Sequence, residues 1–219
     1  KIDTTNMIED VPQSKLDNNI NFRNIIINGD MSIAQRGTST SVSASTITYS
    51  LDRFLTRANS SASHTVVQST DAPTGFQNSL YLTRDSGQTG SLIRLQQAVE
   101  TKNIVYLRGQ KVTLSFYAKK DSGATDSDLS VTLYTGDGTE RARAITAYDN
   151  EVSAISDTAT LTTSWQKFTF TSSTLISDLS QLSIEISYNG VGTAPSNDGY
   201  FITGVQLEAG TTASDFEFL

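Results

Sequence analysis

Hydrophobic and polar residues alternate along three stretches of the chain, at positions 112–118, 129–134 and 182–188. A period of two is typical of a β-strand that buries one face and turns the other outward. The residues expected to be buried are Leu114, Phe116, Ala118, Leu129, Val131, Leu133, Leu182, Ile184 and Ile186. The residues expected to face outward include Thr113, Ser115, Tyr117, Ser183, Glu185 and Ser187.

Weaker strand patterns fill most of the remaining chain. They occupy positions 45–58, 63–69, 79–83, 91–99, 141–147, 166–171 and 200–207. Clusters such as DSGQTG, DSGATDSD and TGDGTE separate them and are typical of turns. Only positions 101–107 favour a short helical turn. About ten short strands at this spacing predict an all-β fold, an antiparallel β-sandwich or jelly roll.

Composition agrees with one such domain. The chain has 219 residues, and its Ser and Thr content suits strands with a solvated face. Residues 1–22 lack any alternation, so we expect an extended N-terminal stalk or linker there. Residues 23–219 are expected to form the jelly-roll domain.

Charge and composition exclude several partners and bonds. Duplex nucleic acid is excluded as a partner, because it needs a positive footprint, whereas the net charge is −7 and Lys119–Lys120 is the longest basic run. No apolar run approaches the roughly 20 residues of a membrane span, so no membrane insertion is expected. Cysteine is absent, which excludes disulfides.

Catalytic motifs are scarce. His64 is the single histidine, it lies in a predicted strand and is expected at the surface, and no G-x-S-x-G motif accompanies it. A zinc site is nearly excluded, because the chain has no cysteine and one histidine. Paired carboxylates of the glycosidase kind and a calcium site of turn carboxylates both stay open. The candidate acids lie in turns: Asp121, Asp126, Asp128, Asp137, Asp149 and Asp157. We expect no enzyme, no metal site and no cofactor.

Three tyrosines offer a binding surface. Tyr81, Tyr117 and Tyr134 are out of phase with the buried residues of their strands, and a tyrosine ring can stack on the apolar face of a sugar. Arg94 and Gln96 alternate with Ile93 and Leu95, and could face the same way. If the strands of Tyr117 and Tyr134 are neighbours, their two rings could share one outer face with Arg94 and Gln96. Together with Tyr81, these residues are the candidates for glycan binding. The alternative is that the outward tyrosines pack under a loop or between subunits.

Several motifs taken together resemble a known module. They are IINGDMSIAQRG, YSLDRF, LQQAVE, KVTLSFYAK, SWQKFTF and YFITGVQLEAGTTASDFEF. The series resembles the distal module of bacteriophage tail fibres, of the type found in podovirus-like phages of cyanobacteria and marine bacteria. That module is in turn similar to jelly-roll carbohydrate-binding modules.

The resemblance implies a receptor-binding module at the tail-fibre tip of the virion. Its expected partners are host cell-surface polysaccharide or lipopolysaccharide, two further copies in a homotrimer, and the rest of the fibre. It also implies that residues 25–27 are buried beside residues 201–207. Many relatives carry acids before the final valine, where calcium can bind; Thr203 and Gly204 stand there, which argues against a structural calcium.

Two other classes of function stay open. One is an enzyme, a polysaccharide depolymerase, or an accessory carbohydrate-binding module of a secreted enzyme. The other is a purely structural trimeric knob at the fibre tip. Paired acids in a groove would favour the enzyme, and tyrosine rows buried between subunits would favour the knob.

Overall fold

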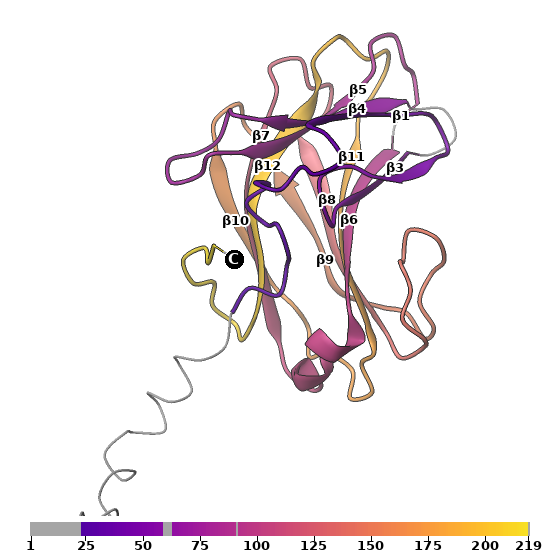
Figure 1. Cartoon of the computed structure of the whole chain (residues 1–219), viewed down its shortest axis with the longest axis vertical. Coiled ribbons are helices and arrows are strands. Elements are labelled where there is room, and N and C mark those ends of the chain that lie inside the picture. Colours follow the sequence, from indigo (N-terminus) through magenta and orange to yellow (C-terminus); the bar gives the residue numbers. More distant parts are fainter. Residues whose placement is uncertain (1–22, 59–62, 91, 219) are drawn as a thin grey trace, which may run out of the picture.

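The protein is a sandwich of two six-stranded antiparallel sheets in a jelly roll, as the alternation predicts (Figure 1). The computed structural model describes residues 23–58, 63–90 and 92–218. Sheet A has the order β1-β4-β5-β12-β7-β10. Its strands are β1 (Ser39–Val42), β4 (His64–Ser69), β5 (Ser79–Arg84), β12 (Asp198–Ala209), β7 (Val112–Lys120) and β10 (Gln166–Thr171).

Sheet B has the order β2-β3-β6-β11-β8-β9. Its strands are β2 (Ile47–Tyr49), β3 (Leu55–Ala58), β6 (Leu92–Val99), β11 (Gln181–Asn189), β8 (Asp128–Gly136) and β9 (Val152–Thr160). Two short 3₁₀ turns, Thr101–Asn103 and Val105–Leu107, follow β6 at one end of the sandwich (Figure 1). They confirm the helical turn expected at 101–107.

Most predicted strands are present, with three differences. The stretch 45–58 divides into β2 and β3, because a tight turn in which the Ser50 N–H bonds to the Phe54 carbonyl separates them. The strand predicted at 141–147 is wrong, since these residues lie in the loop between β8 and β9. β9 itself was not predicted, nor was β1.

The core lies between the sheets and contains all nine residues expected to be buried. The outward residues of β7 and β11 do face away from it, but several are not exposed. Thr113 and Ser115 are buried on the outer side of sheet A, where the Thr113 hydroxyl donates to the Gly210 carbonyl. Ser183 and Glu185 are buried on the outer side of sheet B.

His64 is not a surface residue, contrary to the prediction. It is fully buried, and its Nε2 lies 2.6 Å from the Thr56 hydroxyl. His64 belongs to β4 in sheet A and Thr56 to β3 in sheet B, so this hydrogen bond connects the two sheets through the core. His64 therefore has a structural role, because its imidazole has no access to solvent.

A second cluster of buried polar side chains lies near the start of β12. Arg84 of β5 and Asp198 of β12 form an ion pair within sheet A, with both side chains fully buried. The Asp198 carboxylate also accepts hydrogen bonds from the Tyr188 hydroxyl and from the backbone and hydroxyl of Thr125. Every charge is thereby compensated, which a buried ion pair requires.

The two ends of the domain join as expected. The Ile25 N–H donates to the Leu207 carbonyl at 3.0 Å, and the Val205 N–H donates to the Gly29 carbonyl at 2.9 Å. Ile26 is fully buried, but Ile27 is 39% exposed, so burial of the whole stretch 25–27 was wrong. A turn at residues 27–30 explains the difference, because Ile27 is its first residue and lies outside any strand.

Three further predictions concern segments and ligands. The stalk predicted at residues 1–22 lies outside the described residues. Within the described residues, no group of three or more His, Asp or Glu side chains could hold a metal ion, and no helix has the length and apolarity to cross a membrane.

Gly204 adopts φ +62° where the pairing of β12 with β7 shifts register. A Cβ at this position would lie 2.7 Å from the Phe76 ring, so glycine is required.

Candidate functional site

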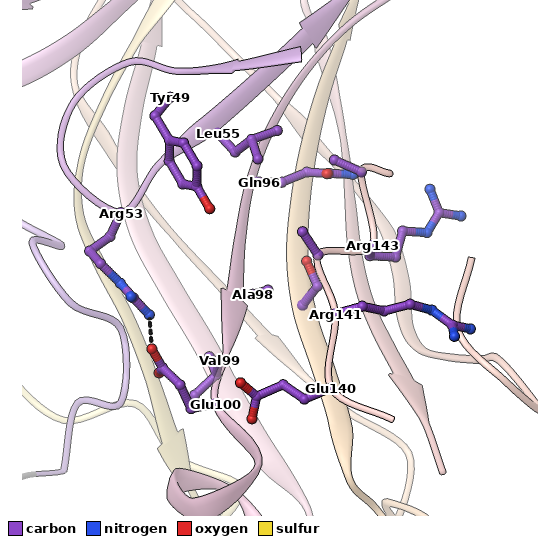
Figure 2. Close-up of a pocket in the computed structure, with 13 residues that line it drawn as sticks. Tyr49, Arg53, Leu55, Gln96, Ala98, Val99, Glu100, Glu140, Arg141 and Arg143 are labelled. Atoms are coloured by element: carbon purple, nitrogen blue, oxygen red, sulfur yellow. Dashed lines mark hydrogen bonds and ion pairs between the residues drawn. The ribbon is translucent and has the colours of Figure 1, made fainter. Parts of the chain in front are cut away.

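A pocket of about 190 Å³ opens on the outer face of sheet B. Its floor and two walls come from distant parts of the chain (Figure 2). The lining residues are Tyr49, Arg53, Leu55, Gln96, Ala98, Val99, Glu100, Glu140, Arg141, Ala142, Arg143, Ala144 and Ser183.

The floor is formed by adjacent strands of sheet B. Register pairs Leu55 with Gln96, and Ala98 with Ser183, so these side chains share the outer face. Ala98 and Ser183 are small, and their size leaves a depression between the larger side chains around them. The same alternation that turns Leu95 and Val99 toward the core turns Gln96 and Ala98 into the pocket.

One wall combines an aromatic ring with an ion pair. Tyr49, on the edge strand β2, is 45% exposed, and the Arg36 guanidinium lies 4.9 Å from its ring centroid. Arg53 Nη2 lies 2.5 Å from Glu100 Oε1 across the pocket edge (Figure 2). Burial alone would raise the pKa of Glu100, but its backbone hydrogen bond and Arg53 hold this pKa below 4.5. Glu100 is therefore ionised at neutral pH.

The opposite wall is the loop of residues 137–151 between β8 and β9. Arg143 anchors it: the guanidinium bonds to both Glu151 carboxylate oxygens at 3.1 and 3.2 Å and lies 3.3 Å from Glu185. Gln181 of β11 also accepts hydrogen bonds from the Gly138 and Asp149 N–H groups. These contacts fix the loop in place beside sheet B.

Glu185 lies at the centre of a polar network beside the pocket. Its carboxylate is nearly buried and is contacted by Arg94 at 3.3 Å, by Arg143, by Gln96 Nε2 and by the Ser187 hydroxyl. Two cations and two neutral donors compensate one buried charge. The network stabilises the pocket's floor and its loop wall together.

The predicted site residues do not form one surface. Arg94, Gln96 and Tyr134 share the outer face of sheet B, but Tyr117 lies on β7 and Tyr81 on β5, both in sheet A. The strands of Tyr117 and Tyr134 are therefore not neighbours, and the shared face assumed for them is wrong. Among the five, only Gln96 lines the pocket.

The rings of the three predicted tyrosines already have partners. Tyr81 stacks on Phe201 with centroids 4.2 Å apart and donates its hydroxyl to Asp121 at 2.9 Å. Tyr117 packs against Phe76 at 5.3 Å, and Arg143 covers Tyr134 at 3.8 Å. Burial and the negative charge of Glu185 raise the pKa of Tyr134. All three are packed residues rather than open rings.

Most of the pocket residues carry no signal in the sequence that marks them as a site. Tyr49 and Arg53 belong to the motif YSLDRF, and Glu100 ends the motif LQQAVE, so two quoted motifs contained them. The motifs alone do not show that these side chains converge with Glu140, which lies in a distant loop. Convergence depends on the pairing of β3 with β6 and on the fold of the loop.

No protein-family model and no curated protein matches the chain. Solved structures do match in fold. The enzymatically active domain of tailspike protein 4 from bacteriophage CBA120 matches with a TM-score of 0.54 and 13% identity, over 85% of this chain and 21% of that one. Carbohydrate-binding modules of the β-sandwich superfamily, described for promiscuous specificity, match with a TM-score of 0.51 and 14% identity, over 72% of this chain and 58% of that one.

Proposed function

We propose that this chain is a receptor-binding module of a phage tail fibre that attaches the virion to host cell-surface glycan without cleaving it. The pocket on sheet B carries the proposal. It places the partly exposed Tyr49 ring beside the charged groups of Arg53 and Glu100 and the hydroxyl of Ser183. A ring that stacks on a sugar, surrounded by hydroxyl-binding polar groups, is the arrangement that binds carbohydrates.

The structural neighbours support both parts of the proposal. One group consists of carbohydrate-binding modules, and the other neighbour is a domain of a phage tailspike. The resemblance of the sequence motifs to tail-fibre modules points to the fibre tip as the location. In this proposal the chain forms a homotrimer, and residues 1–22 join the domain to the rest of the fibre.

The carboxylates of the pocket support binding without hydrolysis. Glycosidases need one carboxylic acid that is protonated at working pH, which requires a raised pKa. The pKa of Glu100 is lowered instead, because of its backbone hydrogen bond and Arg53, although burial opposes this. Glu140, the second carboxylate of the pocket, accepts a hydrogen bond from the Thr101 backbone at 2.6 Å.

The competing function is a polysaccharide depolymerase. Its support is specific: two carboxylates, Glu100 and Glu140, line one pocket, and the tailspike neighbour is an enzymatically active domain. One experiment separates the two functions. Purified host lipopolysaccharide and capsule are printed on an array, and the same polymers are incubated with the protein and analysed by size. Binding with unchanged polymer length supports the proposal; shortening that Glu140→Gln abolishes would establish the enzyme; no binding and no shortening would contradict both.

A further inference from the structure

We propose that the pocket receives the end or a short branch of a neutral glycan chain, and not an internal stretch of it. This inference rests on the glycan-binding function proposed above and names the class of ligand that the same pocket takes. It follows from two bridges that close the pocket, from its size, and from the pairing of its charges.

The first bridge closes the pocket beyond Leu55. Arg57 lies two residues further along β3 on the same face and pairs in register with Arg94. Its Nη1 donates to the Ala144 carbonyl at 2.8 Å. Because Ala144 belongs to the loop wall, this hydrogen bond connects β3 directly to that wall. An extended polymer leaving the pocket in this direction would have to displace the guanidinium.

The second bridge closes the opposite end, where Glu100 and Glu140 lie (Figure 2). The Thr101 N–H donates to Glu140 Oε2 at 2.6 Å, which connects the loop wall to the segment after β6. The Thr101 hydroxyl also donates to the Ser180 carbonyl at 2.7 Å, and the Ser180 hydroxyl donates to Gly138. Together the bridges convert a groove across sheet B into a pocket that opens toward solvent.

The size of the pocket agrees with a short ligand. Its volume of about 190 Å³ lies below the roughly 300–1,000 Å³ of sites that enclose drug-sized molecules. Small side chains, Ala98, Ala142 and Ala144, provide the depth. The space suits about one or two sugar rings, with the rest of the chain outside.

The charges favour a neutral sugar. Each arginine that lines the pocket already has a carboxylate partner: Arg53 pairs with Glu100, Arg141 with Asp149, and Arg143 with Glu151 and Glu185. A uronic acid would have to displace one of these carboxylates and would meet the repulsion of Glu140. Neutral hydroxyls instead accept from the guanidinium groups and donate to the carboxylates without breaking the pairs.

The test uses the full 219-residue chain and matched oligosaccharides. Neutral probes are linear galactose-, glucose-, xylose- and rhamnose-containing disaccharides, tetrasaccharides and octasaccharides; acidic probes are polygalacturonate and alginate fragments of the same lengths. We expect a neutral series to bind with affinities that change less than about threefold between disaccharide and octasaccharide. Saturation-transfer NMR on the octasaccharide should place the contact on its terminal unit.

An affinity that rises about tenfold or more with length, or saturation spread over interior units, would overturn end recognition while leaving glycan binding intact. Preference for the acidic series would overturn the neutral class. If no probe in either series binds, the proposed function fails and this inference fails with it.

A variant tests the first bridge directly. Arg57→Ala, verified as folded by its melting temperature, should open one end of the pocket and make the octasaccharide bind better than the disaccharide. Unchanged length dependence would contradict the role of the Arg57 bridge.

Discussion

The guanidinium carbon of Arg143 lies 3.8 Å from the centroid of the Tyr134 ring. The same guanidinium bonds to Glu151 in its own loop and to Glu185 in the floor of sheet B. Tyr134 was selected from the sequence as a platform for sugar, but in the fold it is the platform for Arg143. One cation thus connects the sheet, the loop wall and the buried carboxylate of the network.

Removal of this cation should loosen the loop wall. Arg143→Ala is expected to lower the free energy of unfolding by about 2 kcal/mol, because hydrogen bonds to charged groups and a cation–π contact are lost together. The matched control is Arg141→Ala in the same loop, whose ion-pair partner Asp149 is 53% exposed at its side chain. The control should cost less than about 1 kcal/mol in urea denaturation. Equal losses would show that Arg143 does not anchor the loop.

Acid should weaken the same anchor. Burial would raise the pKa of Glu151, but the hydrogen bonds from Arg143 and the Tyr148 N–H lower this pKa below 4.5. A carboxylate with a lowered folded-state pKa contributes stability that is full above pH 4.5 and is lost as the pH falls through the folded-state value. The melting temperatures of wild type and Glu151→Gln should therefore differ at neutral pH and converge as the pH falls through the lowered folded-state pKa of Glu151. A difference that persists at low pH would contradict this account.

The Tyr49 ring should contribute to binding and little to folding. Tyr49→Ala is expected to weaken glycan affinity by about 2 kcal/mol, or roughly thirtyfold, as loss of an aromatic anchor typically does. The melting temperature should change little, since the ring is 45% exposed. Tyr106→Ala is the control, because Tyr106 is 50% exposed and does not line the pocket. Equal effects of the two variants on affinity would place the binding site elsewhere.

The buried ion pair should be essential for folding. Asp198→Ala leaves the Arg84 guanidinium buried without its carboxylate, and is expected to cost about 3–5 kcal/mol. Asp71→Ala removes the partner of Lys119 at a site where the Asp71 side chain is 47% exposed. This second variant should cost less than about 1 kcal/mol in the same denaturation experiment. A small effect of Asp198→Ala would mean that the pair contributes little beyond the apolar core around it.

Local alternation explains which strands could be predicted. In β10 every second residue is turned inward without interruption, and its predicted limits 166–171 match the structure. In β9 two consecutive residues, Ala154 and Ile155, are both buried beside a register shift, so the period of two is broken. The stretch 141–147 shows the opposite case: Arg and Ala alternate there, yet the residues form a loop wall.

The sequence by itself determined the fold class, because side-chain alternation and turn residues act within a few positions of one another along the chain. It also identified Gln96 and Arg94 as outward residues of one strand. Only the tertiary structure decided that Tyr117 and Tyr134 lie in different sheets, and that Tyr49, Glu100 and Glu140 converge on one pocket. Strand order depends on pairing between residues far apart in the chain, such as Leu55 with Gln96, and no local pattern encodes which partner a strand selects.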